Sequence, residues 1–300
     1  MSASETARPR GPVARGGVRP GERALAPDLA RGVMLLLIVL SNTGFYLWAA
    51  HHGPSGWHPI DGNALDRAVQ FVMITTLDLR VYPLFAFLFG YGMMQLFLRQ
   101  TAAGTPERTA VALLRRRGLG LIALGFVHAA LLMAGDIIGS YGLMSLLLGW
   151  LFLRRRDRTL LVWCAVAAAV TVLATAPGVE AVLTGQLADL GTSGTELTTI
   201  VYASGEENPL VAAGTRLTTS AYVTVAGGLL SFSGMAVMLL GFWSARRRIL
   251  EEPDRHLPLL RWTAVIGLAV GWSGGLLAAL ATSAGGTSPP RPSPRRGRCA

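Results

Sequence analysis

Two ionisable residues stand in the middle of an otherwise apolar stretch of the chain. His128 and Asp136 begin and end the segment HAALLMAGD, with apolar runs on both sides. An ionisable side chain at membrane depth marks a substrate path, a proton relay or a catalytic group. The alternative for His128 is a neutral histidine hydrogen-bonded to a neighbouring helix, and for Asp136 it is a turn aspartate. The residues alone leave both interpretations open.

Three polar residues accompany the first apolar run. Asp28 and Arg31 stand three positions apart at its start, so they share a helix face and predict an ion pair at the membrane interface. Asn42 lies eleven residues beyond Arg31, roughly 16 Å further along a helix. A buried amide needs a partner, which predicts a hydrogen bond between helices.

A second polar pair precedes the next apolar run. Asp78 and Arg80 come directly before the segment YPLFAFLFGYGM, in which Pro83 falls within a first helical turn. Gly90 and Gly92 in the same segment predict close approach of a neighbouring helix.

A polar loop connects the first run to this segment. It carries His51, His52, His58 and Asp61 in HHGPSGWHPID. Their spacing matches no specific metal site, whereas a loop histidine near the bilayer can act as a general base. The sequence does not distinguish among the three histidines.

The composition places these residues in a membrane protein. Of the 300 residues 51% are hydrophobic and only 15% charged, whereas soluble domains are about a quarter charged. All 27 basic residues are arginine, and they fall between apolar runs, which argues against nucleic-acid binding despite the net charge of +10. The two cysteines form no pair or ligand pattern that indicates a disulfide framework or a zinc site.

Apolar windows long enough to cross a bilayer recur along the whole chain. They predict an all-α, polytopic bundle of about seven transmembrane helices, each near 20 residues. A shorter stretch, 68–77, predicts one interfacial or re-entrant helix. The seven predicted spans are 32–50, 81–98, 118–135, 137–153, 159–179, 221–243 and 262–282. In this arrangement Gly135 and Asp136 form a tight turn, and His128 lies about two helical turns below it.

The arginines predict the orientation, because cytoplasmic loops collect them. Most fall before residue 32 and in the segments 99–117, 154–158 and 246–261. The N-terminus is therefore expected in the cytoplasm and the protein in the cell membrane. The loops 51–80 and 180–216 are expected outside.

The chain divides into four regions on these grounds. Residues 1–22 are expected to be a disordered basic segment, 23–158 a membrane core, and 159–282 a set of further spans. The tail 283–300 is rich in proline and arginine on the predicted external side. That position breaks the charge rule, so we expect the tail to result from truncation of a longer chain.

Three segments in order resemble the YeiB-like bacterial inner-membrane proteins, which carry a domain of unknown function. The segments are DLARGVMLLLIVLSN, YPLFAFLFGYGM and RRRGLGLIALGFVHAALLMAGDIIGSYGLMSLLL, and the resemblance covers residues 23–158. The first segment is also similar to heparan-alpha-glucosaminide N-acetyltransferase and, through it, to a wider superfamily of membrane acyltransferases.

The resemblance implies transfer of an acyl group from cytoplasmic acyl-CoA to an acceptor across the membrane. His128 is the candidate base because it lies in a matching segment, with Asp136 as an orienting group and Asn42 as an oxyanion donor. The histidine of the acyltransferase superfamily follows the first span, a position that His51, His52 and His58 match loosely. Asp28, Arg31 and Arg80 are then the residues expected to meet the phosphates of acyl-CoA, because arginine suits phosphate geometry. Acyl-CoA is a co-substrate in this scheme, and no tightly bound cofactor is expected.

Two other functions stay open on the sequence. A transporter or permease would line its path with the same polar groups, and a membrane protein without turnover needs none of them. The expected partners are the lipid bilayer and an unidentified small molecule, without nucleic acid, and self-association into a homo-oligomer is left open.

Overall fold

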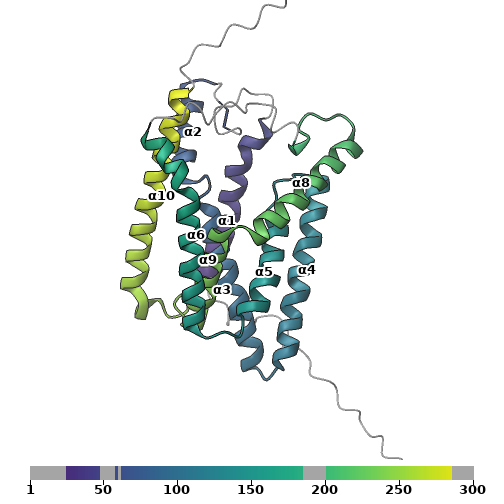
Figure 1. Ribbon diagram of the computed structural model, residues 1–300, viewed down its shortest axis with the longest axis vertical. Helices are drawn as coiled ribbons and strands as arrows, with labels where there is room; N and C mark the ends of the chain where they lie inside the picture. The colour runs from purple at the N-terminus through teal and green to yellow at the C-terminus, as the bar shows by residue number, and fades with distance from the viewer. Residues whose placement is uncertain (1–24, 48–57, 60–61, 185–200, 286–300) are drawn as a thin grey trace, which may run out of the picture.

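A computed structural model of the chain describes residues 25–47, 58–59, 62–184 and 201–285. Within these ranges the regular elements are helices (Figure 1). They are α1 (Leu25–Ser41), η2 (Asn42–Tyr46), α2 (Ala64–Thr76), α3 (Val81–Ala102), α4 (Glu107–Leu131), α5 (Ile138–Phe152), α6 (Asp157–Leu183), α8 (Pro209–Leu229), α9 (Phe232–Arg246), η4 (Pro253–His256) and α10 (Leu257–Gly285). The expectations for segment 1–22, for the tail beyond 285 and for His51, His52 and Asp61 lie outside the described residues.

The helices form a bundle around α3 and α9. These two helices pack against each other, α6 packs on α9, and α4 pairs with α5. The oblique helix α8 lies across α4 and α5, and α10 packs on α2 at the edge of the bundle (Figure 1). The core between α3, α5 and α9 is apolar and includes the fully buried Tyr91, Met94 and Phe242.

Four described helices are long and apolar enough to cross a membrane. They extend over Pro27–Tyr46, Ala64–Ala102, Asp157–Gly178 and Pro253–Leu280, and a bent pair would make a fifth. The predicted spans 32–50, 81–98, 159–179 and 262–282 fall on these four. The predicted number of seven is not confirmed.

Two of the predicted spans belong to elements that do not meet the same test. Helix α5 has only 15 residues. Helix α4 ends at Leu131 rather than at 135. A stretch of α4 long enough to cross a membrane must therefore include arginines from its first half, which lower its apolarity. The windows 118–135 and 137–153 therefore reach their full length only by including residues beyond the ends of the helices.

The predicted span 221–243 is a broken helix in the structure. Helices α8 and α9 meet at an angle of 54° at Leu230 and Ser231. The Ser231 side chain accepts a hydrogen bond from the backbone N–H of Gly234 (3.3 Å), which begins α9 anew. A serine cap inside an apolar window therefore breaks the span.

The short helix predicted over 68–77 is present as α2, which has 13 residues. Asn63 caps α2 by accepting hydrogen bonds from the backbone N–H groups of Leu65 (2.7 Å) and Asp66 (3.1 Å). The helix then leads into α3 through the short break 77–80, and the two form one apolar element of 39 residues. At 1.5 Å per residue the 22 residues of α3 alone are roughly 33 Å long, enough to cross a hydrocarbon core of ~30 Å.

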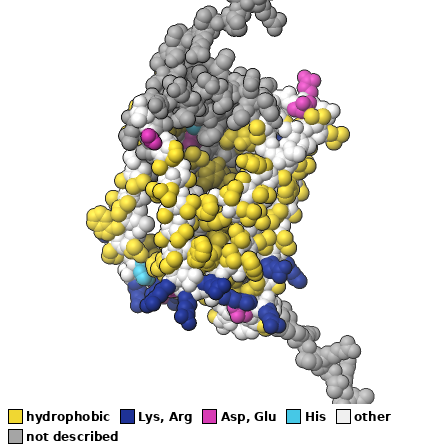
Figure 2. Space-filling view, in the orientation of Figure 1, with side chains coloured by type: hydrophobic (Ala, Val, Ile, Leu, Met, Phe, Trp, Pro, Cys, Tyr) yellow, Lys and Arg dark blue, Asp and Glu magenta, His cyan; other side chains and the backbone are white. Residues whose placement is uncertain are grey.

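Charge is separated between the two ends of the bundle. Figure 2 shows arginine side chains gathered at the lower end, where Figure 1 places the connections from α3 to α4 and from α5 to α6. The broad surface between the ends is hydrophobic. Together with the apolar helices this surface identifies the chain as a multi-pass membrane protein.

Glycines set the closest helix contacts. A Cβ added at Gly90 would lie 2.4 Å from the Met238 carbonyl oxygen, and one at Gly241 would lie 2.4 Å from the Phe87 carbonyl oxygen. Helices α3 and α9 therefore touch backbone to backbone, as predicted for Gly90. Gly92 instead faces the Arg31 guanidinium, 3.1 Å from the position of an added Cβ.

We expect Gly241→Ala to destabilise the bundle by about 1–3 kcal/mol, because its methyl group would overlap a backbone carbonyl that cannot rotate away. Thermal unfolding in detergent measures the effect. Gly267→Ala on α10 is the matched control, since an added Cβ there meets nothing within 4 Å. Equal stability of the two variants would contradict close packing between α3 and α9.

Candidate functional site

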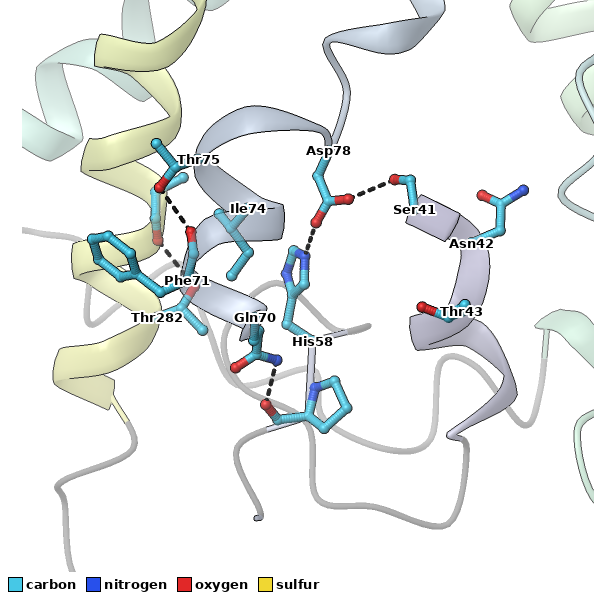
Figure 3. Close-up of polar contacts among 12 residues, drawn as sticks. Ser41, Asn42, Thr43, His58, Gln70, Phe71, Ile74, Thr75, Asp78 and Thr282 are labelled. Atoms are coloured by element: carbon cyan, nitrogen blue, oxygen red, sulfur yellow. Dashed lines mark hydrogen bonds and ion pairs between the residues drawn. The ribbon is translucent and has the colours of Figure 1, made fainter. Parts of the chain in front are cut away.

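A buried carboxylate joins a histidine and a serine from three segments of the chain. Asp78 accepts a hydrogen bond from His58 Nε2 (2.7 Å) on one oxygen and from Ser41 Oγ (2.5 Å) on the other (Figure 3). The side chains of His58 and Asp78 are 11% and 9% exposed. An ionised carboxylate only accepts, so Nε2 carries the proton and Asp78 fixes both the tautomer and the ring orientation.

The break between α2 and α3 positions Asp78. Leu79 has a φ of 62°, a backbone conformation that residues other than glycine seldom adopt, and the chain turns there. Arg80 holds the turn by donating to the carbonyl oxygens of Ile74 (2.9 Å), Asp78 and, across on α10, Gly271 (2.8 Å). Its guanidinium is therefore bonded to three backbone carbonyl oxygens.

His58 is held from the other side by α2. Gln70 Nε2 donates to the carbonyl oxygen of Pro59 (2.5 Å), which ties the residue after His58 to the helix (Figure 3). The histidine is thus placed by contacts to two helices, α2 through Gln70 and the start of α3 through Asp78.

A cavity of about 500 Å³ lies beside this cluster. Ser41 and Asp78 line it, and His58 joins it through Asp78. The other polar side chains that line it carry hydroxyl groups, and the bent pair α8–α9 forms part of its wall. These hydroxyls belong to Tyr82, Ser140, Tyr141, Ser231 and Ser233.

A second cavity, of about 740 Å³, lies between α1, α3 and α4. Asp28 and Arg31 line it and form the predicted ion pair, with Arg31 Nη1 2.6 Å from Asp28 Oδ1. Arg99 and Arg117 line the same cavity. Arg31 and Ser41 stand ten residues apart on α1, so these two polar side chains lie roughly 15 Å apart along that helix.

An aromatic wall separates the two cavities. Phe85 and Phe89 line the arginine-lined cavity, and Tyr141 lines the other. The Tyr141 ring meets Phe85 edge-on at 5.5 Å and stacks on Phe89 at 5.6 Å between centroids. Its hydroxyl donates to the Tyr82 carbonyl oxygen (3.1 Å), which fixes the ring in place.

Asn42 lies next to Ser41 but bonds a different partner. Its Oδ1 accepts from the Tyr82 hydroxyl (2.9 Å), which links the end of α1 to α3. Figure 3 shows the Asn42 side chain pointing away from His58. Its hydrogen bond is the contact between helices that the sequence predicts.

His128 and Asp136 form a separate pair at the turn from α4 to α5. His128 Nδ1 and Asp136 Oδ2 are 3.2 Å apart, but the two atoms are not aligned as a hydrogen bond. Because α4 ends at Leu131, His128 lies in its last turn and touches Asp136, rather than lying two turns below it. Neither residue lines either cavity described above.

Asp136 has a clear structural task at this turn. Its Oδ1 accepts from the backbone N–H of Ile138 (2.8 Å), the first residue of α5. Burial raises the pKa of the carboxyl above its ordinary value of 3.8, and the hydrogen bond to Ile138 and the charge of His128 only partly oppose that shift.

Sequence reasoning missed several of these groups. Ser41, Tyr82 and Tyr141 carried no motif and were not candidates, and Arg117 was counted only in the charge pattern. The contacts of Ser41 with Asp78 and of Tyr141 with Tyr82 join residues that are 37 and 59 positions apart in the chain. Among the described residues no group of three His, Cys, Asp or Glu side chains could hold a metal ion.

The chain is similar to the uncharacterized protein YxaH of Bacillus subtilis (strain 168). The two are 26% identical over 271 residues, which cover 83% of this chain and 64% of the relative. This chain therefore spans less than two thirds of the length of that relative. No family model matches the chain, and no solved structure matches it.

We expect Asp136→Ala to lower the stability of the bundle by about 1 kcal/mol, because α5 loses the side chain that accepts from its first N–H group. Asp136→Asn keeps that oxygen and is the control. The measurement is thermal unfolding in detergent, in which the alanine variant should melt below the asparagine variant at any one pH.

A comparison of Asp136→Asn with the natural protein tests the pKa of Asp136. A carboxyl whose pKa is raised by folding stabilises the fold at low pH and loses that contribution as the pH rises through the raised value. Asp136→Asn cannot ionise, so it should gain stability relative to the natural protein as the pH rises above 3.8. A constant difference across that range would show that Asp136 titrates normally.

Proposed function

We propose that the protein transfers an acyl group from cytoplasmic acyl-CoA to an acceptor on the opposite side of the membrane. The observation that carries this proposal is the buried His58–Asp78 pair, in which a hydrogen-bonded carboxylate orients an imidazole beside a cavity lined with hydroxyl groups. Such a pair is the usual means of taking a proton from a hydroxyl or amine. The proposal gives the role of base to His58 rather than to His128.

In the transfer, the acceptor oxygen or nitrogen attacks the thioester carbonyl carbon. The new C–O or C–N bond forms as the C–S bond breaks, and CoA leaves as a thiolate. This thiolate receives, through water, the proton that the base takes from the acceptor and then releases, so the base returns to its neutral form. The proton lost by the acceptor goes to His58 Nδ1, the ring nitrogen that bears none while Nε2 donates to Asp78. Asp78 stabilises the resulting imidazolium by its charge.

The arginine-lined cavity supplies a place for the donor. Arg31 lies at the end of α1 away from Ser41, on the arginine-rich side of the molecule, and arginine matches the geometry of phosphate. An acyl group carried from this cavity to His58 must pass the wall of Phe85, Phe89 and Tyr141. The resemblance to membrane acyltransferases points to the same chemistry.

The proposal places the arginine-rich end in the cytoplasm, in accord with the charge rule for membrane proteins. In a background with Cys164→Ser and Cys299→Ser, we expect Glu207→Cys to react from outside intact cells with a membrane-impermeant thiol reagent. Arg108→Cys, at the other end of the bundle, should react only after the cells are opened. The reverse pattern would contradict the orientation.

Transfer itself is tested with membranes from cells that produce the chain, supplied with acyl-CoA labelled in its acyl group. Label should pass into envelope material that contains no CoA, and His58→Ala should lower its rate by about 10²–10⁴-fold. Asp78→Asn should lower the rate as well, because its amide can no longer hold the ring in one tautomer.

Two matched histidine variants make this test specific. His256→Ala, on η4 at the arginine-rich end, and His128→Ala should both leave the rate within a few fold of the original. Loss of transfer in His128→Ala but not in His58→Ala would return the role of base to His128. If no label leaves acyl-CoA, the acyltransferase proposal fails.

A transporter is the second candidate, and one observation favours it. Two cavities lie on either side of an aromatic wall, and one of them is lined by the broken helix pair α8–α9. Broken helices that line a central site are a feature of many transporters. Uptake of a solute by vesicles without acyl-CoA, lost on Tyr141→Trp, would support this function over acyl transfer.

A further inference from the structure

The arginine-lined cavity carries more positive than negative charge. Among its lining residues, Arg31 and Arg117 face a single acidic side chain, that of Asp28. Asp28 is already bonded to Arg31 at 2.6 Å. In the part of the chain that the structure describes, no carboxylate pairs with Arg117, whose guanidinium lies 5.7 Å from the centroid of the Phe89 ring. An anion would balance this charge, and phosphate suits the planar guanidinium groups.

Gly92 makes room for the Arg31 guanidinium in this cavity. An added Cβ at Gly92 would lie 3.1 Å from Arg31 Nη2, so the absence of a side chain there leaves space for the guanidinium in the cavity. Arg31 can therefore turn its free N–H groups toward a bound phosphate while it stays on Asp28.

Apart from Gln95 and the arginine and aspartate residues, the side chains that line the cavity are apolar, and the cavity is open at the side. Leu35 on α1 and Leu124 on α4 line it and are 53% and 54% exposed. Both helices pack on α3, whereas the described residues of α1 and α4 make almost no contact with each other. The gap between α1 and α4 therefore opens from the cavity onto the hydrophobic surface of the bundle, where acyl chains of the bilayer lie.

We propose that this cavity binds a long-chain acyl donor that bears phosphate, with its phosphate at Arg31 and Arg117 and its chain in the gap between Leu35 and Leu124. The inference rests on the proposed function and names the class of donor. Long-chain acyl-CoA and an anionic phospholipid share this chemistry, and both can enter sideways from the cytoplasmic leaflet. A short donor such as acetyl-CoA would leave the apolar gap unfilled.

Equilibrium binding of radiolabelled palmitoyl-CoA to the purified chain in neutral detergent tests this inference. We expect saturable binding that is weakened about tenfold or more in Arg117→Gln, because hydrogen bonds to a charged group are lost. Leu124→Trp should weaken it similarly by filling the gap. The matched controls are Arg116→Gln, beside Arg117 but outside the cavity lining, and Leu173→Trp, on the exposed face of α6.

Competitors identify the donor. Unlabelled acetyl-CoA should compete at least about tenfold more weakly than palmitoyl-CoA, because it buries no chain. Competition by short-chain phosphatidylglycerol, but not by phosphatidylcholine of the same chains, would identify a lipid source. Competition by CoA thioesters alone would identify a soluble source, and both results agree with the inference.

Three outcomes would overturn the inference. They are equal competition by acetyl-CoA, equal loss of affinity in Arg116→Gln and Arg117→Gln, and the absence of saturable binding. His58→Ala should bind palmitoyl-CoA unchanged, since His58 lies outside this cavity. Binding without transfer therefore contradicts the proposed function alone, whereas transfer without selective binding contradicts this inference alone.

Discussion

The guanidinium of Arg80 holds the break on which the site depends. A helix that stops inside a membrane protein leaves carbonyl oxygens without partners, and each costs free energy unless another group donates to it. Arg80 donates to two carbonyl oxygens at the break and to a third on α10. The same side chain therefore permits the turn at Leu79, directs Asp78 away from the helix axis and fastens α10 to the bundle.

The distance between packed helices depends on where glycines lie in this bundle. Where glycines face each other's backbone, as between α3 and α9 or between Gly125 and Gly139 of α4 and α5, the helices approach closely and leave no space. Helix α1 has one glycine, Gly32, and an added Cβ there would meet nothing within 4 Å. It consequently stands off from α4, and the space between them is the arginine-lined cavity.

Local features of the fold were predictable from the sequence, and features made by distant contacts were not. Helix α6 and the ion pair of Asp28 with Arg31 follow from continuous apolar runs and from helical spacing. The broken span at Ser231 was hidden because a single serine hardly changes the apolarity of the window. His58 could be named only as one of three loop histidines, since its partner Asp78 lies 20 positions away and reaches it only through the turn at Leu79.

The chain has two histidine–aspartate pairs, and their surroundings suit them to different tasks. Asp78 has both oxygens bonded by donors on its ring partner and on Ser41, an arrangement that favours an ionised carboxylate and an oriented imidazole. One oxygen of Asp136 caps α5, and the other lies near His128 without the alignment of a hydrogen bond. Burial also raises the pKa of this carboxyl. A carboxyl in that setting orients a ring poorly but begins a helix well. His128 and Asp136, which the sequence analysis proposed as base and orienting group, are therefore suited to a structural role. His58, which the sequence could not distinguish from two other loop histidines, has the geometry of a base.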